Sequence, residues 1–176
     1  MISPRTNSLV NVDVTRALFE QEPIFANLIE LYAHDFSEFI ELKLGADGRF
    51  GYEHLQLYWR EPNRHPFLIR VNGDLAGFVF VQRGSQMSAE TDVWDMAEFF
   101  IVRGYRRLGV GTQVAHEIWR KFPGKWEVRA INRNQRAQNF WGRAIEAFLG
   151  KPMASVAFEK NGEGWRLFAF ESKHAA

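Results

Sequence analysis

The stretch AEFFIVRGYRRLGVGT (97–112) joins a hydrophobic run to a short turn that contains arginines and glycines. Hydrophobic residues then recur at helical spacing to about residue 122, so the stretch predicts a strand, a turn and a helix in direct succession. The first N–H groups of such a helix have no intrahelical partner and lie at its positive end. Gly109 and Gly111 leave room for a phosphate against that backbone, which predicts an anion-binding turn.

The glycine spacing excludes two other phosphate-binding motifs. Neither GxxxxGK[ST] nor GxGxxG occurs in the chain. Short glycine motifs also match by chance, so a plain strand-to-helix turn with two conformational glycines is the alternative interpretation.

Composition narrows the class of protein. The chain of 176 residues predicts a single domain over 1–176, with 46% hydrophobic and 24% charged residues. A net charge of +1 argues against nucleic acid and anionic membranes as partners. The absence of cysteine excludes thiolate chemistry, and five scattered histidines without HExxH spacing predict no metal site. No hydrophobic run approaches membrane-spanning length, so we expect a cytoplasmic enzyme or binding protein.

Hydrophobic periodicity predicts the elements around the turn. Strands are expected at 8–16, 67–71, 75–81, 93–103, 126–131, 154–160 and 165–172. Helices are expected at 109–122, at 134–149 and twice within 24–44, where HDFSEF suggests a break. Residues 45–66 are predicted to form a long loop. The order β-αα-βββ-α-β-α-ββ predicts an α/β (α+β) fold with one mixed sheet and helices packed on it.

Two motifs in this order resemble those of a known superfamily. Arg106-x-x-Gly109-x-Gly111 resembles the Arg/Gln-x-x-Gly-x-Gly/Ala signature of the GNAT acyl-CoA-dependent N-acyltransferases. The segment Asn134-x-x-Ala137-x-x-Phe140-Trp141 resembles the second motif of that superfamily. The element order agrees over nearly the whole chain, so the resemblance implies a GNAT-like, mostly antiparallel sheet flanked by helices.

The resemblance also implies a site for acetyl-CoA. The CoA pyrophosphate would bind the backbone of Arg107, Leu108, Gly109, Val110, Gly111 and Thr112. The pantetheine arm would lie along Phe100, Ile101 and Val102, with Asn134, Ala137, Phe140 and Trp141 on its other side. Arg106 and Arg107 would supply charge near the phosphates, although at least one of them is expected to be a solvated surface residue.

Transfer of an acyl group to an amine requires a proton acceptor. Alternation places Glu98 on one face with Trp94, Met96, Phe100 and Val102, and an apolar face raises a carboxyl pKa. Asp95 is the rival base, on the opposite face under strict alternation but on the same face if the strand is bulged. Glu127 is a third candidate, and Glu98 could also be a structural ion-pair partner.

The chain departs from the superfamily at Trp141, where a tyrosine often protonates the departing thiolate. An indole N–H is a donor without useful acidity, so we expect Trp141 to pack beside the pantetheine arm. A water molecule or another tyrosine then acts as the acid, unless the thiolate leaves unprotonated. The tyrosine candidates are Tyr32, Tyr52, Tyr58 and Tyr105.

The acceptor side is expected at the first helices and the loop after them. The candidate acceptor-binding residues are Tyr32, Asp35, Glu38 and Tyr52, with Phe39, Tyr58 and Trp59 nearby. The alternative for Asp35 is a structural role as the N-cap of the second helix, with Glu38 three residues later.

These observations predict an acetyl-CoA-dependent N-acetyltransferase acting on a primary amine of a small molecule or protein. A non-catalytic acyl-CoA-binding module is the main alternative, and an interaction domain that reuses the fold is a third. A homodimer is left open, as are the acceptor amine and the acyl chain.

Overall fold

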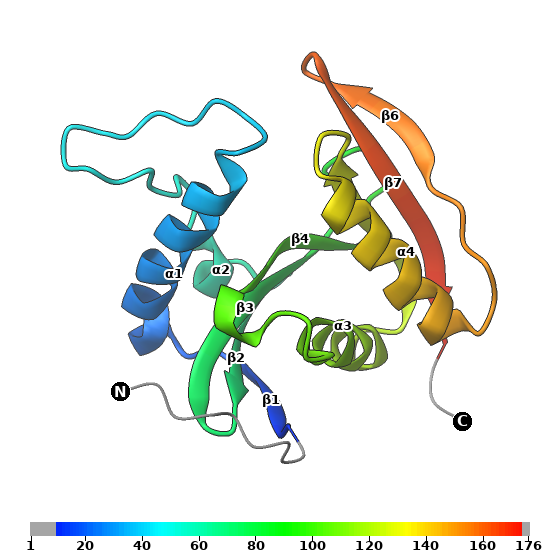
Figure 1. Cartoon of the computed structure of the whole chain (residues 1–176), viewed down its shortest axis with the longest axis horizontal. Coiled ribbons are helices and arrows are strands. Elements are labelled where there is room, and N and C mark those ends of the chain that lie inside the picture. Colours follow the sequence, from blue (N-terminus) through cyan, green and yellow to red (C-terminus); the bar gives the residue numbers. More distant parts are fainter. Residues whose placement is uncertain (1–9, 174–176) are drawn as a thin grey trace.

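A seven-stranded sheet with strand order β1-β2-β3-β4-β5-β7-β6 runs through the computed structural model, which describes residues 10–173 (Figure 1). Neighbouring strands are antiparallel except β4 and β5, which are parallel. The strands are β1 (Val12–Arg16), β2 (Arg64–Val71), β3 (Asp74–Arg83), β4 (Trp94–Ile101), β5 (Gly124–Ile131), β6 (Val156–Lys160) and β7 (Glu163–Ser172). The predicted mixed, mostly antiparallel sheet is confirmed.

Helices cover both faces of the sheet, with α1 and α2 on one face and α3 and α4 on the other (Figure 1). Their bounds are α1 (Glu22–Phe36), α2 (Leu57–Arg60), α3 (Val110–Lys121) and α4 (Gln135–Leu149), and short 3-10 turns lie at η1 (Phe19–Gln21) and η2 (Arg103–Tyr105). Each face has its own hydrophobic core. One contains Phe25 of α1 with Phe78 and Phe80 of β3, and the other contains Val114, Ile118 and Trp119 of α3. No helix within residues 10–173 is long and apolar enough to cross a bilayer.

The element order is as predicted, but the second helix lies elsewhere. Residues 37–44 form turns and loop after α1 ends at Phe36, and the second helix is α2, inside the predicted loop 45–66. The ring of Phe39 still packs on that of Phe36 at 6.2 Å, because the Phe39 N–H bonds to the Phe36 carbonyl in a turn. The hydrophobic residues therefore keep helical spacing as far as Phe39, although the helix itself ends at Phe36. Residues 8 and 9 of the predicted first strand lie outside the described residues.

Strands β4 and β5 separate soon after they start. Only Trp94↔Trp126 and Asp95↔Glu127 are paired between them, whereas β4 pairs with β3 as far as Ile101. Beyond Asp95, the side of β4 that faces β5 therefore has backbone groups without a sheet partner.

A β-bulge in β4 changes the alternation of its side chains. Phe80 pairs with Glu98 and Val81 with Met96, so Ala97 is the extra residue. Trp94 and Met96 pack in the α3/α4 core, whereas Ala97 and Phe100 pack in the α1/α2 core. The expectation that Glu98 shares a face with Trp94 and Met96 is therefore wrong. The bulge instead places Asp95 and Glu98 on the same face, the arrangement that strict alternation excluded.

Candidate active site

The turn before α3 has the backbone of an anion-binding nest. Arg107 and Gly109 both have left-handed φ angles, 63° and 77°. Gln113 donates to the Gly109 carbonyl, so the N–H groups of 110–112 have no partner within the helix. Left-handed residues in such a turn direct successive N–H groups into one concavity, which suits a phosphate. A Cβ added at Gly109 would meet no atom within 4 Å, so the space above that residue is open.

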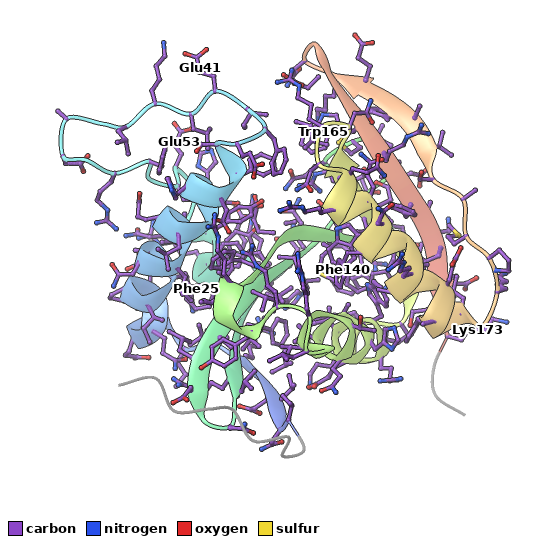
Figure 2. All side chains as sticks on the ribbon, viewed as in Figure 1. Phe25, Glu41, Glu53, Phe140, Trp165 and Lys173 are labelled. Atoms are coloured by element: carbon purple, nitrogen blue, oxygen red, sulfur yellow. The ribbon has the colours of Figure 1, made fainter. Side chains whose placement is uncertain are left out.

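Gly111 has a packing role that the sequence did not reveal. A Cβ at this position would lie 3.1 Å from the ring of Phe140 on α4. Phe140 projects from α4 toward the middle of the molecule, and its ring centroid lies 5.8 Å from that of Phe99 (Figure 2). Gly111 thus allows α3 and α4 to approach each other beside β4.

The arginines near the turn have different environments. Arg103 and Arg106 both donate to the Asp35 carboxylate of α1, at 2.6 and 2.5 Å, and Arg106 Nε donates to the Ile101 carbonyl at 2.6 Å. Burial alone would raise the pKa of Asp35, but hydrogen bonds from Arg106 and Arg103 outweigh it and lower that pKa. Arg107 is exposed. Asp35 lies within α1, so its alternative role as an N-cap is wrong.

The predicted pantetheine strand has one edge that faces the separation of β4 and β5. Val102 donates to the Ala76 carbonyl on the β3 side. Alternation therefore turns the backbone of Ile101 and Phe99 away from β3. Phe99, which sequence reasoning did not single out, contacts Trp141 with ring centroids 4.9 Å apart.

The second motif begins α4 and fills the core beside β4. Asn134 is the N-cap, and its Oδ1 accepts the Ala137 N–H at 2.9 Å. Trp141 is buried, 6% exposed, among Phe99, Trp119 and Phe140. The structure therefore gives Trp141 a packing position.

Glu98 accepts hydrogen bonds from two tyrosines on the α1 side of the sheet. Tyr32 Oη lies 2.6 Å from Glu98 Oε2, and Tyr52 Oη lies 3.2 Å from Oε1. Burial raises the pKa of Glu98, although the Arg129 charge and the two hydroxyls act in the opposite direction. The same burial, together with the Glu98 charge, raises the pKa of Tyr32 and of Tyr52. Because the pKa values of both tyrosines are raised above their usual value, the two hydroxyls keep their protons and act as the donors to Glu98.

Asp95 belongs to a buried ion pair with Arg129, a residue that sequence reasoning missed. Arg129 Nη1 lies 2.6 Å from Asp95 Oδ1, and Nη2 donates to Gln86 Oε1 and to the carbonyl of the bulged Ala97. Burial raises the pKa of Asp95 to about 6 despite the opposing charge of Arg129. The sequence of β5 does not indicate that Arg129 pairs with Asp95, because only the fold shows that β4 lies beside β5.

The remaining candidates lie around this centre. Glu127 accepts from Ser85 and from Ser88, and it pairs in the sheet beside Asp95. Tyr58 is buried, with its ring stacked on Phe80 at 3.8 Å. Glu38 is exposed after the end of α1. The structure thus brings Tyr32, Tyr52, Asp95 and Glu98 together and leaves Glu38 outside.

Comparisons with known proteins agree with this architecture. The model of the acetyltransferase (GNAT) family matches residues 25–145. No curated protein matches the chain.

Solved structures share the fold at low sequence identity. An acetyltransferase from Thermus thermophilus is similar with a TM-score of 0.65 and 14% identity, covering 91% of this chain and 96% of that one. NAA60 from Arabidopsis thaliana in complex with acetyl-CoA gives 0.59 and 12%, covering 92% and 98%. An aminoglycoside acetyltransferase, meta-AAC0020, from an uncultured soil metagenomic sample in complex with sisomicin gives 0.57 and 18%, covering 76% and 86%.

Proposed function

The chain belongs to the acetyltransferase (GNAT) family, and on this basis we propose that it transfers an acetyl group from acetyl-CoA to a primary amine. The observation that carries the proposal is the position of Glu98. Its carboxylate lies on the α1 side of β4, held by two tyrosine hydroxyls, next to the strand edge that β5 leaves unpaired.

The residues before α3 fit the phosphates of acetyl-CoA. The nest at 107–112 has unpartnered N–H groups, left-handed residues at Arg107 and Gly109, and open space above Gly109. Phe99 and Ile101 would face the pantetheine arm from β4, and Phe140 and Trp141 would flank it from α4. When bound, acetyl-CoA supplies the acetyl group as a thioester.

Glu98 is proposed to take the proton of the incoming amine. An amine is mostly an ammonium ion at neutral pH and has no free electron pair for attack until it loses a proton. The carboxylate oxygens of Glu98 accept that proton, while the hydroxyls of Tyr32 and Tyr52 hold the carboxylate in one orientation. Backbone N–H groups on the free edge of β4 would stabilise the negative charge that develops on the carbonyl oxygen.

The acceptor assignments are narrowed by these contacts. Tyr32 and Tyr52 keep the proposed role beside the amine. Asp35 is neutralised by Arg103 and Arg106, so we propose that it holds α1 to the turn before α3. Arg107 is the arginine proposed to add charge near the phosphates.

The test is an assay of CoA release with a library of amines. Glu98→Gln keeps the shape of the side chain and removes the proton acceptor, so turnover falls about 10²-fold or more with CoA affinity little changed. Asp95→Asn and Glu127→Gln test the rival carboxylates, and Glu171→Gln on β7 is the control for an exposed glutamate. Normal turnover of Glu98→Gln, with loss in Asp95→Asn, would reassign the base.

A non-catalytic acyl-CoA-binding module is the second candidate, favoured by Trp141 in the place of the usual acid. Calorimetry with CoA separates the two, because both bind CoA but only an enzyme releases CoA from acetyl-CoA in the presence of an amine. Binding without release across the whole library would support the second candidate.

A further inference from the structure

A cavity of about 160 Å³ lies between α1 and the loop after it, on the same face of the sheet as Glu98. Ile29, Tyr32 and Phe36 of α1 form one wall, and Leu42, Phe50 and Tyr52 of the loop form the other. The lining is therefore mainly hydrophobic and aromatic, with Tyr32, Tyr52 and Lys43 as the residues that carry polar groups, which is the usual composition of a small-molecule site.

The loop wall of this cavity is anchored. Glu30 of α1 accepts the backbone N–H groups of Phe50 and Gly51, at 2.7 and 3.0 Å, and Arg49 lies 3.5 Å from the same carboxylate. Gly51 has a φ angle of 71°, a left-handed conformation that turns the chain toward Tyr52. These contacts fix the backbone on both sides of the Phe50 ring.

Tyr32 and Tyr52 connect the cavity to the proposed base. Their rings line the cavity, and both hydroxyls donate to Glu98. An amine bound against these two tyrosines is therefore separated by one tyrosine hydroxyl from the Glu98 carboxylate, the proposed proton acceptor.

The volume and the charges of the cavity restrict the rest of the acceptor. An apolar cavity of about 150 Å³ accepts a benzene ring, so this cavity suits a body of about one aromatic ring. Lys43 is the charged residue in its lining as far as the described chain shows. Lys43 is 85% exposed and lies 3.4 Å from Glu41, and the lining contains no carboxylate, so a second ammonium group on the acceptor would have no partner of opposite charge in the cavity.

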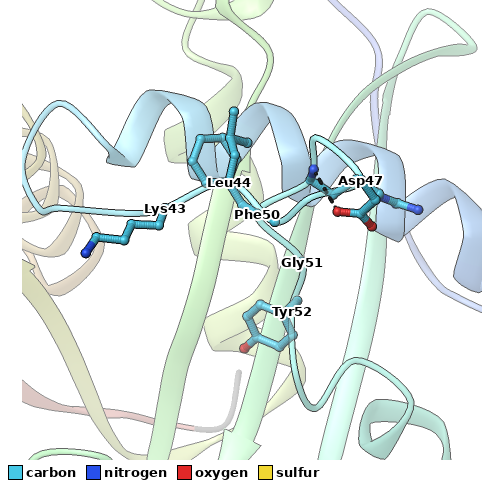
Figure 3. Close-up of a pocket in the computed structure, with 8 residues that line it drawn as sticks. Lys43, Leu44, Asp47, Phe50, Gly51 and Tyr52 are labelled. Carbon is cyan, nitrogen blue, oxygen red and sulfur yellow. Dashed lines mark hydrogen bonds between the residues drawn. The ribbon is translucent and has the colours of Figure 1, made fainter.

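A wider hollow of about 530 Å³, whose lining residues are drawn in Figure 3, adjoins the cavity. Lys43, Phe50, Gly51 and Tyr52 line both, and Asp47 and Arg49 belong to the outer hollow alone. The outer hollow is open and has both charged and apolar lining residues, so it can take the remainder of a larger acceptor.

We propose that the acceptor is a monoamine whose amino group is carried on an apolar body of about one aromatic ring, bound between α1 and residues 42–52. The proposal rests on the proposed acetyltransferase function and names the substrate class of the same site. The body is either a free arylalkylamine or the first residue of a peptide with a large hydrophobic side chain, and the assay separates these two sources.

The experiment compares 2-phenylethylamine, a tetrapeptide that begins with phenylalanine, and spermidine. Two quantities are measured for each amine: kcat/KM for CoA release, and binding to the protein without acetyl-CoA by calorimetry. We expect one of the two ring-bearing amines to exceed spermidine at least tenfold in both quantities. The better of the two identifies the source.

Leu42→Trp fills the cavity from the loop side and tests the location. We expect Leu42→Trp to raise KM for the preferred amine about tenfold, while kcat at saturating amine changes little. An unchanged affinity for CoA would show that the variant is folded. Leu31→Trp is the matched control, because Leu31 is an exposed leucine of α1 outside the cavity lining.

The results separate the substrate class from the underlying function. Equal or better binding and turnover of spermidine, or an unchanged KM in Leu42→Trp, would overturn the proposed substrate class and leave the acetyltransferase intact. Binding of the ring-bearing amine that Leu42→Trp weakens, without CoA release, would support the cavity and overturn the enzyme. Absence of binding by both ring-bearing amines would overturn the cavity assignment directly.

Discussion

Tyr32 of α1 and Glu98 of β4 are joined by a hydrogen bond of 2.6 Å between Oη and Oε2. The bond crosses from the helix layer to the sheet, so α1 fixes the orientation of the proposed base. Tyr52 adds a longer bond, 3.2 Å, from the loop that covers the same face. Both donors stabilise the charged form of Glu98 against the effect of burial.

Removing the shorter bond is expected to shift the pH dependence of turnover. Tyr32→Phe deletes a donor to the carboxylate, so the pKa of Glu98 rises further and the acidic limb of kcat/KM moves to higher pH. Tyr52→Phe should move the limb in the same direction by less, because its bond is longer. The measurement is kcat/KM from pH 5 to 9 at saturating acetyl-CoA. An acidic limb that stays in place in both variants would mean that another group sets it.

Arg129 is expected to support both the fold and the charge of Glu98. Arg129→Met leaves Asp95 buried without its partner, which costs about 3–5 kcal/mol of unfolding free energy. The loss should be smaller at pH 5.5 than at pH 7.5, because an unpaired Asp95 can then take a proton. Urea unfolding at the two pH values measures it, and Arg129→Met with Asp95→Asn should recover part of the loss. A single variant as stable as the parent at pH 7.5 would contradict this.

Gly109→Val is expected to abolish CoA binding. A valine side chain would stand over the nest, and its left-handed φ angle would be strained. Gly150→Val is the matched control, because Gly150 also has a left-handed φ angle, 68°, and open space around its Cα, but it lies at the far end of α4. Calorimetry with CoA should show binding in the control and none in Gly109→Val. Normal CoA affinity in Gly109→Val would show that the CoA phosphates do not bind at this turn.

His65 is expected to make the fold sensitive to acid. Burial, with a smaller contribution from the charge of Arg16, lowers the pKa of His65 to about 4. The neutral ring packs against Trp94 and Phe122. The folded protein therefore binds fewer protons than the unfolded chain between about pH 6.5 and 4, and stability is lost as the pH falls through this window.

The loss attributable to His65 is on the order of 2 kcal/mol between pH 7.5 and 4.5. His65→Gln should remove that part of the pH dependence, whatever its effect on stability at pH 7.5. His54→Gln, at an exposed histidine, is the matched control. Urea unfolding at both pH values gives the free energy of unfolding of each protein. The same difference between pH 7.5 and pH 4.5 in all three proteins would contradict the assignment.

The fold was largely predictable because its signals are local. The strands on either side of Asn72-Gly73, the helix after Gly109 and the helix that begins at 134 each depend on residues close in sequence. The second helix was misplaced because a hydrogen-bonded turn kept Phe36 and Phe39 in contact beyond the end of α1.

The candidate site was predictable in part, and the missing part depends on pairing between distant segments. Glu98 and the two tyrosines were named from the sequence, but their mutual contacts span 66 and 46 residues. The bulge at Ala97 is defined by the register against β3, which no periodicity within β4 reveals. Arg129 and Asp95 meet because β4 and β5 are neighbours for two residue pairs.

The short contact between β4 and β5 divides the sheet into two half-sheets that meet along a weak seam. Strands β1 to β4 form one unit of the sheet and β5 to β7 the other, and among the described residues the backbone pairing between them is limited to Trp94↔Trp126 and Asp95↔Glu127. A ligand that forms hydrogen bonds to the free edge of β4 and also contacts α4 would connect the two units. We therefore expect occupancy to slow amide hydrogen exchange on both sides of the seam, so that the two units open as one.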